Sequence, residues 1–184
     1  MLVFHFLFPL TIVSKFKHSI KKMIFIFKTK FIKQRLKGTE MKNEHPGVSC
    51  LYKFIDAFNT AEKNKIITNL HFPHYVHSNG NEPVVYKNGE DFWKSLKAQL
   101  DTMIKVENWS FSTLDKCKII NETDKTLQCE VNFNRRLINK KSYGSAKGIW
   151  ISTNRDGNWA LQIRSMIPVS GTISSLAGTN MNNS

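Results

Sequence analysis

The chain has 184 residues, of which 41% are hydrophobic, and this is enough for a single globular domain with a buried core. The composition excludes collagen-like, coiled-coil and wholly disordered chains. Lys and Arg number 27 against 14 Asp and Glu, so the formal net charge is +13. A charge of this size would favour nucleic acid or an anionic membrane as a partner.

The positive charge is concentrated at the start of the chain. Residues 1–40 carry nine basic residues and one acid, a net charge of +8, while residues 41–184 carry 18 basic and 13 acidic residues, a net charge of +5. The second part has no stripe of Lys and Arg interleaved with aromatic residues, which a surface that follows a phosphate backbone would have. We therefore expect no nucleic-acid partner.

Residues 1–40 are a low-complexity basic and apolar extension, in which 24 positions are Phe, Lys, Ile or Leu. The apolar run 2–13 is shorter than the ~20 residues of a membrane span, and its lysines follow it, which is the reverse of a secretory signal. Three interpretations stay open: a membrane-surface anchor, a transit peptide, and a misassigned start or disordered tail. We favour the third, because Met41 opens a segment of ordinary globular composition. A membrane partner is expected only if this extension is an anchor.

The cysteines give little functional information. Cys50, Cys117 and Cys129 are odd in number and have no C-x-x-C spacing, so neither a disulfide framework nor a zinc site is indicated. We expect a reduced, cytoplasmic location. The sequence contains no glycine-rich phosphate loop, nucleophile elbow or Cys–His dyad, and we expect no cofactor.

The segment after Gly47 predicts three helices and a hairpin. An apolar stripe at i, i+3, i+4 and i+7 predicts a first helix over about 48–60, followed by a short helix over 61–70. Pro73 predicts an extended segment, and the Asn-Gly-Asn turn after it predicts a hairpin into 84–86. A third helix begins at the acids Glu90 and Asp91, where the helix dipole favours negative charge.

Four long runs rich in β-branched and aromatic residues predict strands, at 106–120, 126–138, 143–153 and 158–167. The short connections between them predict an antiparallel meander. In the second run every other residue from Leu127 to Leu137 shares one face, which we expect to be buried. The turn at Asp156-Gly157 places Trp150 opposite Ile163. One face of the sheet would then carry four residues, namely Trp150, Trp159, Leu161 and Ile163. Residues 169–184 are predicted to be a disordered tail.

The element order α-α-β-β-α-β-β-β-β predicts an α+β domain over 41–168, with three helices on one side of a strongly curved antiparallel sheet of about six strands. This order, together with Phe54-Ile-Asp-Ala-Phe58 followed by Leu70-His-Phe-Pro-His-Tyr-Val-His77, resembles the nuclear transport factor 2-like superfamily. That superfamily includes SnoaL-like polyketide cyclases, scytalone dehydratase and ketosteroid isomerase. The resemblance covers about 47–168 and implies a cystatin-like cone with a mostly apolar pocket at its open end, a fold that serves enzymes, ligand binders and interaction modules.

His77 is the candidate catalytic residue, and two other histidines, His71 and His74, stand close to it in sequence. On a helix this spacing would suggest a metal site, but Pro73 favours a strand, on which His74 and His77 point to opposite faces. We therefore expect no metal site. His77 lies about where ketosteroid-isomerase-like proteins carry their general-base Asp, and a neutral imidazole could remove a proton next to a carbonyl. The alternative is a hydrogen-bonded histidine at a hairpin edge.

Arg135 and four aromatic residues are the candidate ligand-binding residues. Arg135 shares the face of Phe133, so that it either reaches an anionic group in the pocket or lies at the rim, the interpretation that we favour. Trp93, Trp109, Trp150 and Phe133 are predicted to contact the ligand, and the alternative for each tryptophan is a place in the core.

The other face of the predicted sheet carries apolar residues, namely Ile149, Ile151, Ala160 and Met166, which a solvated face would not need. We expect a homodimer through this outer sheet face. Our functional hypothesis is a SnoaL-like protein that binds a small, largely apolar organic molecule, with cofactor-free isomerase, dehydratase or cyclase-type proton transfer by His77. The competing hypothesis is a non-catalytic ligand-binding or homodimerisation module.

Overall fold

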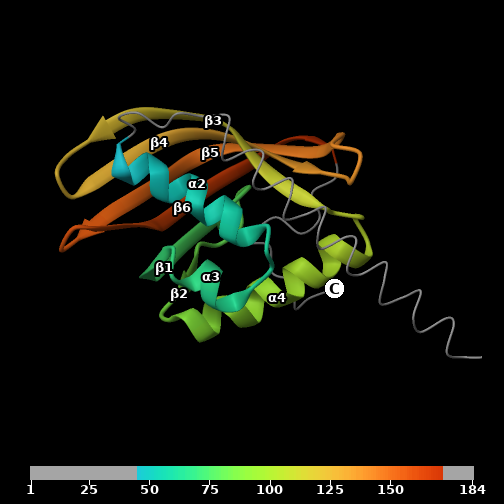
Figure 1. The fold of residues 1–184 in the computed structure, drawn as a ribbon, viewed down its shortest axis with the longest axis horizontal. Helices are drawn as coiled ribbons and strands as arrows, with labels where there is room; N and C mark the ends of the chain where they lie inside the picture. Colours follow the sequence, from blue (N-terminus) through green and yellow to red (C-terminus); the bar gives the residue numbers. More distant parts are fainter. Residues whose placement is uncertain (1–44, 172–184) are drawn as a thin grey trace, which may run out of the picture. The chain divides into compact units, whose positions relative to one another are not determined.

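The computed structural model describes residues 45–171 (Figure 1). The predicted extension 1–40 and residues 172–184 of the predicted tail lie outside the described residues. The elements in chain order are α2 (Pro46–Phe58), α3 (Lys63–Ile67), β1 (Leu70–Ser78), β2 (Val84–Tyr86), α4 (Gly89–Lys105), β3 (Phe111–Glu122), β4 (Thr126–Arg136), β5 (Ser142–Arg155) and β6 (Asn158–Gly171).

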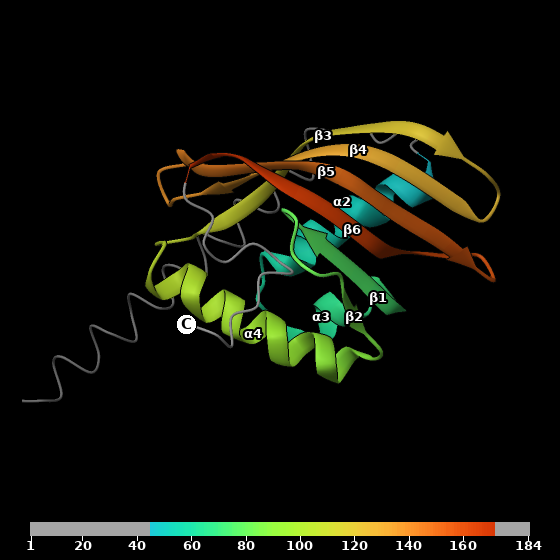
Figure 2. The same cartoon turned by 180° about the vertical axis from the view of Figure 1, so that it is seen from behind.

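The strands form one six-stranded sheet in the order β2-β1-β6-β5-β4-β3. Helix α2 lies along the inner face of this sheet and contacts β3, β4, β5 and β6, while α4 contacts β2 and α3 (Figures 1 and 2). The predicted α+β architecture of three helices on a curved sheet is confirmed. One pairing differs from the prediction of an antiparallel sheet, because β1 and β6 run parallel.

The first predicted helix is confirmed as α2, and its N-terminus is fixed to the sheet. Nδ1 of His45 accepts a hydrogen bond from the Gly47 amide at 3.0 Å, and the hydroxyl of Ser152 donates to the Gly47 carbonyl at 3.0 Å. A Cβ atom at Gly47 would lie 2.8 Å from Oγ of Ser152 and 2.9 Å from the Trp159 ring. Glycine therefore allows the helix to approach the sheet closely.

The second predicted helix is shorter than expected, since α3 ends at Ile67 and β1 already begins at Leu70. The side chains of Thr68 and Asn69 both bond to carbonyl groups of the last helical turn, which competes with a further turn of helix. The third predicted helix is confirmed as α4, where the Asn88 side chain accepts from the amide of Asp91 at 3.0 Å. No helix within residues 45–171 has the length and apolar character to cross a membrane.

The predicted alternation in 126–138 is confirmed, because every second residue of β4 from Leu127 to Arg135 is buried. The preceding strand begins at Phe111 and not at Val106 as predicted. Asn108 has a positive φ of 55°, and the Trp109 amide bonds back to the Met103 carbonyl of α4 at 2.9 Å. These residues therefore form a turn out of the helix and leave the strand five residues shorter at its start.

The pairing of β5 with β6 differs from the prediction by one residue. Trp150 lies opposite Arg164, and Ile151 lies opposite Ile163, with an irregularity between Ile151 and Ser152. Because a shift of one residue exchanges the two faces of a strand, Arg164 and not Ile163 shares the inner face with Trp150. The predicted outer-face position of Met166 is wrong for the same reason, since Met166 belongs to the core.

The last strand continues through residues 169–171, which the sequence analysis assigned to the tail. Ser170 lies opposite Ser145 of β5, and their hydroxyl oxygens are 2.6 Å apart, while Gly171 lies opposite Gly144. Pairing with the start of β5 therefore extends the folded part beyond the predicted boundary at 168.

Candidate ligand-binding site

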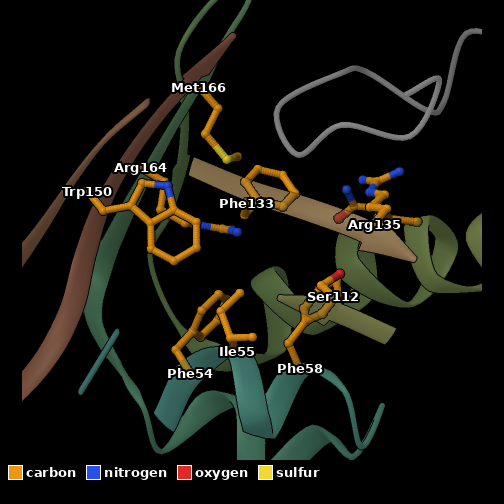
Figure 3. A pocket seen from close by; sticks show the side chains of 10 residues that line it. Phe54, Ile55, Phe58, Ser112, Phe133, Arg135, Trp150, Arg164 and Met166 are labelled. Atoms are coloured by element: carbon orange, nitrogen blue, oxygen red, sulfur yellow. The ribbon is translucent and has the colours of Figure 1, made fainter. Parts of the chain in front are cut away.

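A small pocket lies between α2 and the inner face of the sheet (Figure 3). Its lining residues are Phe54, Ile55 and Phe58 from α2, Gln99 from α4, Ser112 from β3, Phe133 and Arg135 from β4, Trp150 from β5, and Arg164 and Met166 from β6. The free volume is about 30 Å³, which is room for about two water molecules. The lining contains no Asp or Glu, although it contains two arginines.

Trp150 forms the centre of the aromatic wall. Its ring contacts Phe54 edge to face at a centroid distance of 5.9 Å and Phe133 at 6.2 Å. The indole Nε1 is buried and has no hydrogen-bond partner among residues 45–171. A buried N–H group without an acceptor is uncommon in folded proteins, and here it belongs to a residue that lines the pocket.

Arg164 enters the pocket from β6 and is only 5% exposed. Its Nε donates a hydrogen bond to Nε2 of His74 at 3.2 Å, and the guanidinium lies over the rings of Phe54 at 5.1 Å and Phe92 at 5.7 Å. Burial lowers the pKa of Arg164 to about 10, against a smaller opposing effect of Tyr86. The guanidinium therefore remains positively charged at neutral pH.

His74 lies behind Arg164 and is completely buried. Its ring meets Phe92 edge to face at 5.3 Å. Burial, with the positive charge of Arg164 as a second cause and a hydrogen bond to the Leu161 backbone opposing both, holds the pKa of His74 well below its usual value. His74 is therefore neutral, and its Nε2 lone pair accepts the hydrogen bond from Arg164.

Arg135 lies at the other side of the pocket in a buried ion pair with Glu107. Nη1 of Arg135 is 2.8 Å from Oε2 of Glu107, and the two side chains are 3% and 6% exposed. The hydroxyl of Tyr143 donates to the same oxygen at 2.7 Å, and burial together with this bond raises the pKa of Tyr143. The predicted rim position of Arg135 is wrong, because Glu107 reaches the buried guanidinium from the turn after α4.

His77 does not reach this pocket. It is half-buried on the face of β1 opposite to His74, and its Nδ1 lies 3.1 Å from the Ser165 hydroxyl. The placement matches the alternative interpretation, a hydrogen-bonded histidine near a hairpin, and it separates His77 from any molecule bound beneath α2. The predicted catalytic position of His77 in the pocket is therefore corrected.

The predicted aromatic residues divide into two groups. Phe133 and Trp150 line the pocket together with Arg135. Trp109 lies behind the lining, where its Nε1 donates to Oγ of Ser112 at 3.0 Å and its ring meets Phe58 at 5.6 Å. Trp93 packs on the core from α4 and is not part of the lining.

The three histidines of β1 do not converge on one point. Nδ1 of His71 lies 2.8 Å from the Thr153 hydroxyl, whereas His74 and His77 occupy opposite faces. Across residues 45–171, no group of three or more His, Cys, Asp or Glu side chains is arranged to hold a metal ion.

Of the ten lining residues, the sequence analysis assigned Phe133, Arg135 and Trp150 to the site. It missed Arg164 with its partner His74, and the residues Glu107 and Tyr143 that join the ion pair of Arg135. A signal for Arg164 is present, because a charged residue lies within the predicted strand 158–167, between the apolar residues Ile163 and Met166. Glu107 has no such signal, since its approach to Arg135 depends on the turn between α4 and β3.

The geometry defines an α+β cone protein with a small, aromatic and cationic pocket beneath its first described helix. No family model matches the chain, and no curated protein matches it. Among solved structures, the chain is similar to a cystatin-like protein of unknown function from Nostoc punctiforme, with 12% identity over 69% of this chain and 91% of that one and a TM-score of 0.56.

Two further structures have the same fold. A nuclear transport factor 2-like protein from Cytophaga hutchinsonii is 13% identical over 66% of this chain and 94% of that one, with a TM-score of 0.50. A candidate calcium/calmodulin-dependent protein kinase II association domain from Xanthomonas campestris is 13% identical over 73% and 94%, with a TM-score of 0.53. At these identities the similarity shows the fold alone. The predicted fold, that of the nuclear transport factor 2-like superfamily, is confirmed.

Proposed function

We propose that the protein binds a small organic molecule in the pocket beneath α2. The observation that carries this proposal is a small pocket in which aromatic side chains surround polar groups without full partners. The indole N–H of Trp150 has no acceptor among the described residues, and the guanidinium of Arg164 has one hydrogen bond there, to His74. Mostly apolar walls with a few polar groups that fix orientation are typical of ligand pockets.

The size of the pocket limits the bound group. A free volume of about 30 Å³ accepts a compact functional group with few non-hydrogen atoms. A steroid or polyketide, as the superfamily resemblance implies for some members, exceeds this volume unless the walls move. We therefore propose a compact ligand, or a compact group of a larger ligand, as the occupant.

Binding is better supported than proton-transfer catalysis. No carboxylate or histidine is among the lining residues, and His77 lies on the opposite face of the sheet. His74 contacts the lining residue Arg164, but its Nε2 lone pair already accepts a hydrogen bond from Arg164. A general base must reach the proton that it removes within hydrogen-bond distance, and no lining residue offers this.

The full chain should be screened by thermal shift against small molecules that end in a compact group of about two or three non-hydrogen atoms, the size that the pocket accepts. A fragment at 100 times its Kd should stabilise the protein by about 2.7 kcal/mol. Ile55→Phe fills the pocket from α2 and should remove the shift, while His77→Ala on the outer face should keep it. Met166→Phe provides a second filled pocket if the first variant does not fold. A shift that survives in the filled variants contradicts the proposal.

A homodimerisation module is the second candidate function, favoured by one observation. Ile149 of β5 and Ile167 of β6 are 44% and 54% exposed, and Tyr75 of β1 is also exposed. All three lie on the outer face of neighbouring strands. Exposed apolar residues that gather on one face of a sheet favour a contact with another protein.

A dimer through this outer face should dissociate when Ile149 is replaced with Lys, because the charge would be buried in the contact without a partner. Ile138→Lys is the matched control, since Ile138 is 80% exposed in the β4–β5 turn. Sedimentation velocity should then show a monomer for Ile149→Lys and a dimer for the control. A parent protein that sediments as a monomer at micromolar concentration contradicts this second function.

A further inference from the structure

Arg164 is a buried charge without a counter-charge among the described residues. The ion pairs within residues 45–171 include Arg135 but not Arg164. The two lining arginines therefore differ: Glu107 compensates Arg135, and a neutral histidine is the hydrogen-bond partner of Arg164. The aromatic faces of Phe54 and Phe92 compensate a cation only in part.

An uncompensated buried cation is costly, and folded proteins retain one where an anion completes the site. His74 cannot supply that anion, because it is neutral. The bond to His74 uses Nε of the guanidinium and leaves its two terminal nitrogens for a ligand. Figure 3 shows Arg164 beside Trp150 and Arg135 at the other side of the pocket, beyond Phe133.

A second donor belongs to the same wall. The indole Nε1 of Trp150 is buried, has no acceptor among the described residues, and belongs to the residue opposite Arg164 in the sheet. A group that satisfies both residues must accept several hydrogen bonds and carry negative charge. A carboxylate has two acceptor oxygens in a plane that fits the guanidinium fork.

We propose that the group bound in this pocket is the carboxylate of a small organic acid, with Arg164 as its counter-charge and Trp150 as a further donor. This inference rests on the proposed binding function and specifies its ligand class. The aromatic rings of Phe54, Phe133 and Trp150 give the bound carboxylate apolar surroundings. The small free volume favours a planar carboxylate over a tetrahedral phosphate.

The test compares two isosteric pairs on the full chain, acetate with acetamide and propionate with propionamide. Binding is measured by thermal shift and by calorimetry, with sodium chloride as an ionic-strength control. We expect each carboxylate to bind at least tenfold more tightly than its amide. Arg164→Met should remove this difference, and Arg164→Lys, which keeps the charge without the fork, should keep part of it.

Each outcome separates the two proposals. Equal binding of acid and amide at the pocket overturns the carboxylate assignment and leaves the binding function intact. No binding of either member, with no shift from any neutral fragment, overturns both. Stabilisation by inorganic phosphate equal to that by propionate also overturns the assignment to a carboxylate.

The unfolding midpoint of Arg164→Met without ligand tests the role of Arg164 independently of the binding measurements. Because Arg164→Met removes a charge without a counter-charge, its unfolding midpoint without ligand should equal or exceed that of the parent. A purely structural Arg164 would give a lower midpoint. A lower midpoint, with acetate and acetamide still distinguished, would contradict the role of Arg164 as the carboxylate partner.

Discussion

Replacing Glu107 with Gln should lower the free energy of unfolding by about 3–5 kcal/mol. Glu107 is the counter-charge of buried Arg135 and also accepts the hydrogen bond of Tyr143. The amide keeps the shape of the side chain and removes its charge, which leaves the guanidinium buried without compensation. Urea unfolding at neutral pH measures the effect as a change in midpoint.

An exposed carboxylate provides the matched control for this substitution. Glu62 pairs with Lys65 at 2.8 Å, with both side chains more than half exposed, so Glu62→Gln should leave the stability almost unchanged. Replacing Glu107 and Arg135 together with Leu and Met should recover most of the loss, because the buried charge is then absent. Equal effects of Glu107→Gln and Glu62→Gln would contradict the burial of the ion pair.

His74→Gln should make the free energy of unfolding depend less on pH below neutrality. The folded-state pKa of His74 lies well below its ordinary value of 6.5, so between these two values the unfolded chain binds more protons than the folded one. Stability is therefore fully present above pH 6.5 and falls as the pH decreases, by up to about 1.4 kcal/mol per pH unit for one proton.

The measurement is the urea midpoint of the parent and of His74→Gln from pH 7.5 to pH 5. The difference between their slopes isolates His74, because the carboxylates of the two proteins are the same. The absolute stability of His74→Gln does not affect this comparison. Identical slopes for the two proteins would contradict a buried, neutral His74.

Much of the fold follows from local pattern. The stripe of Leu51, Phe54, Ile55 and Phe58 predicts α2 because a helix with one apolar face must pack on a sheet. The strict alternation in β4 predicts its buried face for the corresponding reason. Both features depend on neighbours in the chain, and the structure confirms both.

The site was harder to predict because it depends on contacts between distant segments. One irregularity between Ile151 and Ser152 decides that Arg164 points inward, and a pattern of period two does not show where a strand shifts its register. Arg135 was assigned to its correct face, but its partner Glu107 comes from a turn 28 residues earlier. The alternation argument for opposite faces of His74 and His77 was correct, and the resemblance favoured His77, which lies on the face away from the pocket.

The two lining arginines suggest how one fold combines stability with binding. Arg135 is paired with a carboxylate of the chain itself and belongs to the scaffold. Arg164 lies in the same pocket and is held by a neutral histidine and two aromatic rings, which fix its position and leave its charge for a ligand. The same residue type therefore has two roles that only the partner distinguishes.

The most direct test of the pocket is the indole region of a ¹H–¹⁵N spectrum of the full chain during a titration with propionate. The four tryptophans give separate N–H signals, which Trp→Phe variants assign. The account predicts that the Trp150 signal moves with saturation while those of Trp93 and Trp159, which do not line the pocket, stay in place. A saturable shift of Trp93 or Trp159 with a fixed Trp150 signal, or no shift at all, would contradict a binding site beneath α2.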